Sequence, residues 1–408
     1  MRKSHDILGE LLPLERIEIP SGTKVFDWMV PPEWRMREAH VTAPDGRRLF
    51  DVAENNLHLV GYSIPFRGRL SRAELDKHLH SLPDLPQAVP YVTSYYRRDW
   101  GFCVPHNIRQ SLPDGDYDVV VDTTLDDKGS MTLSEAVLPG ASDSEVLIST
   151  YTCHPSLANN ELSGPLAASF LYRRLAAWPE RRRTFRFVFL PETIGSIAYL
   201  HRCGDHLKAK VAAGFVVTCV GLDDAFTYKR SKRGDTVADR AAELTLRDLK
   251  AAGGPDYRVL DFFPSGSDER QYCSQAFNLQ VGSLMRGMYA TRPEYHTSLD
   301  NRGHISFKAL RETIDAYEAI CRAIDKNAVY RSKVTHGEPF LSKYDLYPPK
   351  NDPREVRPDV MDTLWLLSLA DGTNDLLSIA ARSNMSVERL IDAARRCQRA
   401  GLIAEGAA

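Results

Sequence analysis

The sequence predicts an α/β protein with a mainly parallel sheet flanked by helices, joined to a small inserted β-rich domain and a C-terminal winged-helix domain. Three observations support this prediction. Apolar, β-branched runs of strand length recur along the chain, at 145–152, 184–191, 213–221 and 279–286. Helix-length segments lie between them, at 164–178, 195–206 and 236–252. Continuous apolar strands that alternate with helices are typical of a parallel sheet covered on both faces. The third observation is the C-terminal segment, whose three short helical stretches and turn residues fit a helix-turn-helix or winged-helix unit.

These patterns divide the chain into five expected parts. Residues 1–22 are predicted as an amphipathic helix and a loop at the start of the α/β domain, and residues 23–116 as the inserted β-rich domain. The α/β domain is expected at 117–335, with the run YDVVVDTTL as its first strand. A linker containing Pro and Lys at 336–354 leads into the winged-helix-like domain at 355–408.

Local signals predict individual elements within these parts. The Asp45-Gly46 step in the extended stretch 40–63 indicates a hairpin. A helix is expected over 71–81, because Ser71 can cap its start and a glutamate stands three residues later. Residues 306–327 carry apolar side chains on one stripe and predict the last helix of the α/β domain.

Composition excludes several classes of protein. A net charge of −2 creates no field that would attract nucleic acid or an anionic membrane. No apolar run approaches the roughly 20 residues of a membrane span, and acidic residues interrupt the N-terminus before a signal-peptide core could form. The seven cysteines are scattered and form no paired C-x-x-C cluster. We therefore expect a reduced, cytoplasmic setting.

Polar side chains cluster directly after the predicted strands. His154 follows the run 145–152, and Glu192 follows the run 184–191. His296 stands in a later loop, after the last predicted strand of the sheet. Because an open α/β sheet binds ligands at the carboxyl ends of its strands, we expect these side chains to meet there. Imidazoles and carboxylates can supply three metal ligands and leave a position open for water.

These motifs resemble the co-catalytic zinc aminopeptidase superfamily, which includes bacterial leucyl aminopeptidases and glutamate carboxypeptidase. The nearest resemblance is to its aminopeptidase-like branch with an inserted β-domain and a C-terminal winged helix. The similarity runs through PSGTKVFDWMVPPEW, GYSIPF, WGFC, CHPSLANNELSGP, PETIGS, GSDERQYC and EYHTSLDN. It implies a zinc-peptidase-like fold and a metal-dependent amide hydrolase.

The superfamily's metal-site residues are only partly present. The resemblance implies that His154 and His296 are zinc ligands. Asn160 falls where the superfamily has an aspartate that bridges two zinc ions, and Thr218 where it has another metal-binding aspartate. An adjacent pair of glutamates is reduced to Glu192, which is expected to act as ligand or base. Because two closely spaced ions would have too little negative charge, one Zn²⁺ per chain is expected, held by His154, Glu192, His296 and Asn160.

The sequence offers further candidate residues for catalysis and substrate binding. Glu161 is expected either as a catalytic base or as a helix-capping carboxylate. The run 228–235 is either a solvated basic loop or a patch that binds an acidic substrate group. The expected substrate-binding residues are Asp268, Glu269, Arg270, Tyr272, Tyr295, Arg230 and Arg233.

Two functions are compatible with this sequence. The first is a zinc-dependent hydrolase of a small peptide or amide, an aminopeptidase or a deacylase. The second is a catalytically weak relative that binds a peptide or amino-acid-like ligand, with the winged helix for assembly. A DNA-binding regulator is disfavoured, because the predicted recognition helix mixes acidic residues with its arginines. We expect a homo-oligomer and neither a nucleic-acid nor a membrane partner.

Overall fold

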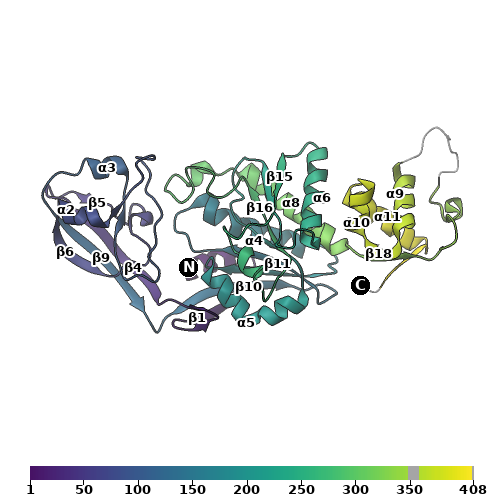
Figure 1. Cartoon of the computed structure of the whole chain (residues 1–408), viewed down its shortest axis with the longest axis horizontal. Helices are drawn as coiled ribbons and strands as arrows, with labels where there is room; N and C mark the ends of the chain where they lie inside the picture. The colour runs from purple at the N-terminus through teal and green to yellow at the C-terminus, as the bar shows by residue number, and fades with distance from the viewer. Residues whose placement is uncertain (348–357, 407–408) are drawn as a thin grey trace.

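The computed structural model describes residues 1–347 and 358–406, and it arranges them as three units in a row (Figure 1). The central unit is built on an eight-stranded sheet with the order β1-β10-β12-β11-β13-β16-β14-β15. Its bounds are β1 (Glu15–Pro20), β10 (Ser130–Leu138), β11 (Glu145–Tyr151), β12 (Thr184–Leu190), β13 (Val211–Val216), β14 (Phe226–Lys229), β15 (Tyr257–Leu260) and β16 (Val281–Arg286).

The four central strands β12, β11, β13 and β16 pair in parallel, while β10 and β14 pair antiparallel on either side. Every residue of β11 is buried, as its apolar sequence predicts for a strand covered on both faces. The α/β fold with a mainly parallel sheet is thereby confirmed. The strands β1, β10, β14 and β15 were not predicted, because charged residues interrupt their apolar sequences.

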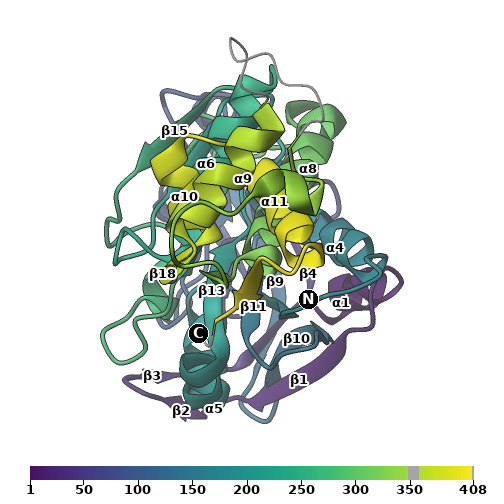
Figure 2. The same ribbon diagram turned by 90° about the vertical axis from the view of Figure 1, so that its right-hand side faces the viewer.

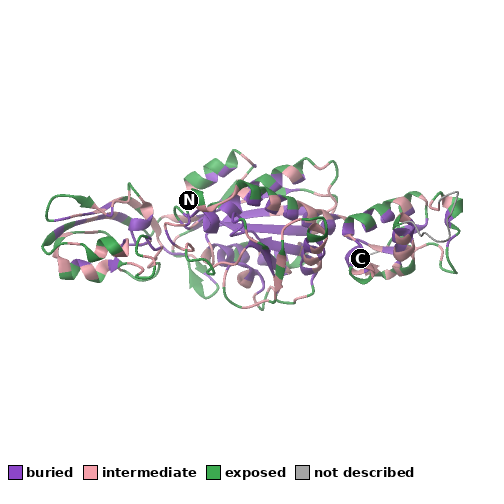
Figure 3. Cartoon of the chain, turned by 90° about the horizontal axis from the view of Figure 1, so that it is seen from above, coloured by how far each residue is buried: buried purple, intermediate pink, exposed green. Residues whose placement is uncertain are grey.

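Helices cover both faces of this sheet. Alternate side chains of β11 point to opposite faces: Val146 and Ile148 join a core with α4 (Ser163–Ala176), α6 (Val237–Ala251) and α8 (Phe307–Lys326). Leu147 joins a second core with α5 (Ile194–Lys210) and α7 (Glu269–Tyr272). The strands are accordingly the most continuously buried part of the molecule (Figure 3). No helix among the described residues has both the length and the apolar character needed to cross a membrane.

The small β-rich unit has a four-stranded antiparallel sheet, β5-β4-β9-β6. Its strands are β4 (Glu33–Thr42), β5 (Arg48–Leu49), β6 (Phe66–Ser71) and β9 (Asp116–Asp126). The predicted hairpin is present, and Gly46 takes the positive φ of 84° that its turn requires. The prediction that residues 117–125 open the α/β domain is wrong, since β9 pairs with β4 and β6. The alternating apolar residues of β9 pack in the core of the β-rich unit instead.

Two predictions near the N-terminus also need correction. The loop predicted after α1 (Arg2–Gly9) contains the edge strand β1, which pairs with β10. The helix predicted over 71–81 has its Ser71–Glu74 capping box, but α2 (Arg72–Leu75) is short. The chain continues as a 3₁₀ turn at Asp76–His78 and as β7 (Leu79–His80), which pairs with β8 (Phe102–Cys103). Tertiary strand pairing has overridden the helical signal.

The C-terminal unit contains α9 (Pro358–Leu369), α10 (Leu376–Ser383) and α11 (Val387–Arg399). A three-stranded sheet joins β17 (Val329–Ser332), β18 (Asp371–Asp375) and β19 (Ile403–Glu405). Since β17 belongs to this sheet, the unit begins well before the predicted boundary at 355. Part of the predicted linker, residues 348–354, lies outside the described residues.

This unit packs against α6 and α8 of the central unit (Figure 2). Asp375 lies at the contact: its Oδ2 accepts hydrogen bonds from Arg240 Nη2 and Asn327 Nδ2, each at 2.9 Å. Its Oδ1 accepts from the backbone N–H of Ser378 at 2.8 Å and so caps α10. Burial opposes ionisation of Asp375, but the bonds from Asn327 and Ser378 outweigh it and lower the pKa of this carboxyl.

Asp375→Ala is therefore expected to lower the free energy of unfolding of the C-terminal unit by about 2 kcal/mol, through loss of the cap and of buried charge pairing. Because the folded pKa lies below the unfolded value of about 3.9, this stabilisation is present at neutral pH and is lost as the pH falls below that value. Chemical denaturation at pH 7 and pH 3 measures both effects. The control is Asp371→Ala on the same strand, whose exposed carboxylate bonds Thr373 of its own turn. Equal effects of the two substitutions would contradict the assignment.

Candidate metal centre

The loops that follow the central parallel strands bring three predicted residues together. His154 follows β11, Glu192 follows β12, and His296 lies in the loop between β16 and α8. The two imidazole rings are 5.1 Å apart between centroids, and His154 Nε2 is 3.6 Å from Glu192 Oε2. Parallel strands end at one edge of a sheet, so side chains far apart in sequence converge there.

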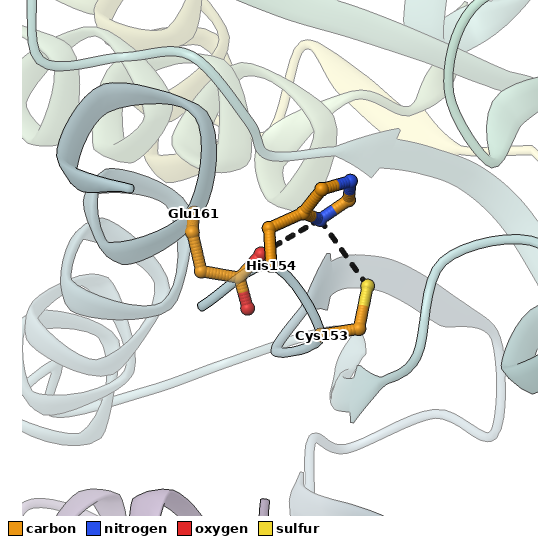
Figure 4. Close-up of side chains that lie close together, drawn as sticks. All are labelled: Cys153, His154 and Glu161. Carbon is orange, nitrogen blue, oxygen red and sulfur yellow. Dashed lines mark hydrogen bonds and ion pairs between the residues drawn. The ribbon is translucent and has the colours of Figure 1, made fainter. Parts of the chain in front are cut away.

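A second carboxyl contacts the other nitrogen of His154 (Figure 4). Glu161 Oε2 lies 3.0 Å from His154 Nδ1, and the backbone N–H groups of Cys153 and His154 also bond this carboxyl. Glu161 belongs to a π-helical turn, η3 (Ala158–Leu162), which leads into α4. A π-helical turn holds an extra residue and re-aims its side chains, a feature frequent at functional sites. The geometry fits neither of the two roles expected for Glu161. Its carboxyl contacts His154 Nδ1 and caps no helix, and Glu161 does not line the cavity that His154, Glu192 and His296 share.

Burial controls the charge of these groups. It lowers the pKa of His154 to about 4. Burial, together with repulsion from His154, lowers the pKa of His296 to about 3. Both imidazoles are therefore neutral at pH 7, which is the form that binds metal ions. Burial and the nearby Asp268 raise the pKa of Glu192 to about 8. A cation beside Glu192 would reverse this shift, since an opposite charge favours the ionised form.

The donor set fits one divalent metal ion. His296 Nε2 is buried and has no hydrogen-bond partner, and Tyr295 stacks on the same ring at 3.9 Å between centroids. The 3.6 Å between His154 Nε2 and Glu192 Oε2 is close to the ~3.3 Å that separates two ligand atoms of a tetrahedral zinc ion. Cys153 Sγ, a ring nitrogen of His154 and a carboxylate oxygen of Glu161 also lie within 4.8 Å of one another. Glu161 already bonds Nδ1, however, and this leaves Nε2 as the nitrogen available to an ion.

Asn160 and Thr218, the described residues expected where a second ion would bind, are not comparable ligands. Asn160 is buried, its Nδ2 has no partner, and its Oδ1 faces Cys219 Sγ at 3.9 Å. Thr218 Oγ1 is 2.5 Å from the hydroxyl of Tyr151. Neither side chain carries the negative charge that a bridging ligand supplies, so Asn160 and Thr218 provide no anionic donor for a second ion.

Asp268 and Arg270 hold the turn that carries Glu192. Thr193 takes a positive φ of 65°, which is unfavourable for a β-branched residue. Its N–H donates to Asp268 Oδ1 at 2.7 Å, and its Oγ1 accepts from Arg270 Nη2 at 3.0 Å. Ser196 Oγ also donates to Asp268 Oδ1 at 2.8 Å. The structure therefore places Asp268 and Arg270 behind Glu192, where they fix its backbone, and not on the cavity wall predicted for them.

Four other residues predicted to bind substrate lie elsewhere. Glu269 is fully buried and pairs with Lys229 at 2.6 Å, and Tyr272 is a core residue whose hydroxyl is 2.8 Å from Ser149 Oγ. The run 228–235 is neither a solvated basic loop nor a single patch that binds an acidic group, because Lys229 is fully buried in β14.

The arginines of this run do not reach the metal centre. Arg230 pairs with Glu243 at 2.6 Å and with Asp261 at 2.8 Å. Arg233 lines a separate hollow beside Lys208 and Phe277. The Arg230 guanidinium is therefore already paired with carboxylates of this chain.

A cavity of about 360 Å³ lies over the candidate metal centre. His154, Glu192 and His296 line it, together with aromatic residues of the β-rich unit. The ring of Tyr91 lies 5.0 Å from that of His154 and 5.2 Å from that of His296. Its N–H donates to His296 O at 2.8 Å. Sequence reasoning missed Tyr91, although the density of aromatic residues at 91–105 was a signal.

Asp300 is a further residue that the sequence did not single out. Its Oδ1 accepts from Asn159 N at 2.7 Å, and its Oδ2 accepts from Asn160 N at 2.9 Å. A carboxylate at the N-terminus of a helical turn satisfies N–H groups that lack partners. Because Asp300 is four residues after His296, this bond couples the His296 loop to the turn that carries Glu161.

Comparison with known proteins places this geometry in a family. Residues 1–327 match the family described as Domain of unknown function (DUF4910), and residues 328–405 match a winged helix-turn-helix family. A Clostridium acetobutylicum protein, provisionally named a polysaccharide biosynthesis protein with aminopeptidase-like domain, is 40% identical over 403 residues, covering 99% of this chain and 91% of that protein.

Solved structures agree on the fold. The crystal structure of a provisionally named peptidase from Clostridium acetobutylicum superposes with a TM-score of 0.91 at 40% identity, covering 99% of this chain and 91% of its own. A zinc aminopeptidase from Bacillus subtilis has a TM-score of 0.54 at 14% identity, with 78% of this chain and 88% of its own covered. A Peptidase M28 precursor from Shewanella amazonensis also scores 0.54, at 13% identity and with 85% and 88% covered. The predicted resemblance is confirmed: this chain belongs to the DUF4910 family, and in it an aminopeptidase-like α/β fold precedes a winged helix-turn-helix.

Proposed function

We propose that this protein is a metal-dependent hydrolase of a small peptide or amide. The observation that carries the proposal is the convergence of His154, His296 and Glu192 at the carboxyl edge of the parallel strands. The aminopeptidase-like fold and the names of the similar proteins support it. Hydrolysis adds the oxygen of water to the carbonyl carbon, breaks the C–N bond and transfers a proton to the departing amine.

One zinc or similar ion per chain is proposed as the cofactor, held by His154 Nε2, His296 and Glu192. When bound, such an ion polarises a carbonyl oxygen and makes water more acidic. The two neutral imidazoles contribute nitrogen lone pairs, and the carboxylate contributes the negative charge that Asn160 lacks.

The chain's own residues prepare these ligands. In the tautomer with hydrogen on Nδ1, His154 Nδ1–H donates a hydrogen bond to Glu161 Oε2, which leaves Nε2 unprotonated and fixes the ring orientation. Glu192 is the only carboxyl among the described residues that line the cavity. Since a carboxylate has two oxygens, Oε2 can face the ion while Oε1 accepts a proton from the attacking water. Tyr91 and Tyr295 cover the imidazoles and limit access of bulk water.

For the winged-helix unit we infer a packing role. Arg389 of α11 bonds Asp362 of α9, and Arg396 bonds the carbonyl of Asp359. Arginines committed to intramolecular contacts are less available to the phosphates of DNA.

His296→Ala is expected to remove both metal and activity, because a site with three protein ligands has none to spare. Elemental analysis of purified protein should find close to one equivalent of zinc in the wild type and below about 0.1 equivalent in the variant. His336→Ala, on an exposed residue, should behave as the wild type. Two tightly held equivalents, or none after zinc reconstitution, would contradict the mononuclear site, and the latter would favour a ligand-binding role.

Substitutions at the two glutamates should separate ligand from orienting residue. Glu192→Gln is expected to lower both zinc affinity and turnover, the latter by about 10²–10⁴-fold, because a neutral amide is a poor ligand and a poor proton acceptor. Glu161→Gln keeps an acceptor oxygen for His154 Nδ1 and should cost about 10–100-fold in zinc affinity. Competition with a chromophoric chelator measures the affinities. Full zinc content with lost turnover in Glu192→Gln would make this residue a base only.

A further inference from the structure

The cavity over the metal centre has an aromatic wall, formed by Trp28, Tyr91, Tyr95 and Tyr96. Trp28 belongs to the short hairpin of β2 (Lys24–Val25) and β3 (Trp28–Met29), and the tyrosines lie in the following β-rich unit. The side chains at the mouth remain open to solvent: Trp28 is 41% exposed, Tyr95 39% and Tyr96 57%. Exposed aromatic groups gathered at the rim of a pocket mark a binding surface.

The wall is held in place from behind. Tyr96 donates its hydroxyl hydrogen to Met29 O at 2.8 Å, and its ring meets that of Trp28 edge to face at 6.1 Å. Tyr95 packs on Tyr62 at 5.0 Å, and Tyr62 stacks in turn on Trp34 at 5.8 Å. The rings are therefore ordered before a ligand arrives, which lowers the entropic cost of binding.

The wall offers very little charge to a ligand. Apart from tyrosines, the ionisable residues that line the cavity in the described chain are Cys153, His154, Glu192 and His296. Asp268 and Glu269, which lie behind Glu192, do not reach it. Glu192 is used for the metal and the proton. Among the other described residues that line this cavity, none is a carboxylate that could pair with a substrate ammonium, and none is a Lys or Arg that could pair with a substrate carboxylate.

We propose that the cavity selects an amide whose neighbouring group is an uncharged ring with a flat apolar face, stacked on Trp28 and Tyr96. The statement that the amide bond is cleaved rests on the proposed hydrolase function, whereas the recognition of the ring does not. Two kinds of group share this chemistry, a pyranose sugar ring and an aromatic amino-acid side chain with a blocked amine. Either would place its amide over His154 and His296 while the ring covers the aromatic wall.

The test measures binding to the full-length protein by isothermal titration calorimetry. The probes are methyl N-acetylglucosaminide, N-acetylphenylalanine amide, N-acetylalanine amide without a ring, and phenylalanine amide with a free amine. One of the two blocked ring probes should bind at least about tenfold more tightly than the ringless amide, and its identity shows which ring is preferred. The free amine should bind more weakly than its acetylated form.

Trp28→Ala and Tyr96→Ala should each raise the Kd of the preferred ring probe by about 3–10-fold, as expected for loss of an aromatic contact. Both residues are exposed, and Trp28→Phe should restore most of the affinity. The matched control is Phe26→Ala in the same hairpin, because Phe26 packs away from the cavity on His201 and Phe277.

Equal affinity for ring and ringless amides, no binding of any probe, or tighter binding of the free amine would each overturn the inference. Product release, followed separately by chromatography, reports on the hydrolase. Ring-selective binding without hydrolysis would therefore refute the proposed function alone, and hydrolysis without ring selectivity would refute this inference alone.

Discussion

The candidate site depends on the parallel hydrogen bonding of β11 between β12 and β13. This pairing makes β11 and β12 end at the same edge, so the residues that follow them, His154 and Glu192, face one another across 3.6 Å. Because every residue of β11 is buried, a slip in its register would move each side chain into the core on the opposite face, where it would not fit the packing around it. The packed sheet thus acts as a rigid frame for side chains that a loop alone could not hold.

Three carboxyls on this frame lie at different distances from the candidate metal centre. Glu192 lines the cavity, Glu161 contacts the far nitrogen of His154, and Asp268 bonds the backbone after Glu192. Their burial is costly when ionised, as the raised pKa values of about 8 for Glu192 and about 7 for Asp268 indicate, each caused first by burial. A cation at the centre would offset this cost, so a metal ion and this cluster would stabilise one another.

The three units of the molecule contribute unequally to the site. The α/β unit supplies every candidate ligand. The hairpin of β2 and β3 and the β-rich unit supply the aromatic wall, which includes Tyr91 over the imidazoles. The winged-helix unit packs on α6 and α8, where residues such as Asp375 bond the central unit. Its contribution to the site is therefore indirect, through the helices that cover one face of the sheet.

The sequence by itself determined the α/β class, the winged helix and the meeting of His154, Glu192 and His296, because buried strands and polar residues at their ends leave local patterns. Tertiary structure alone decided that β9 joins the small sheet, that Lys229 is buried and that Asp268 and Arg270 stand behind Glu192. It also decided the position of the Glu161 carboxyl, since the π-helical turn places it against His154. Such contacts join residues far apart in the chain or depend on one extra residue in a turn, and neither leaves a periodic signal in the sequence.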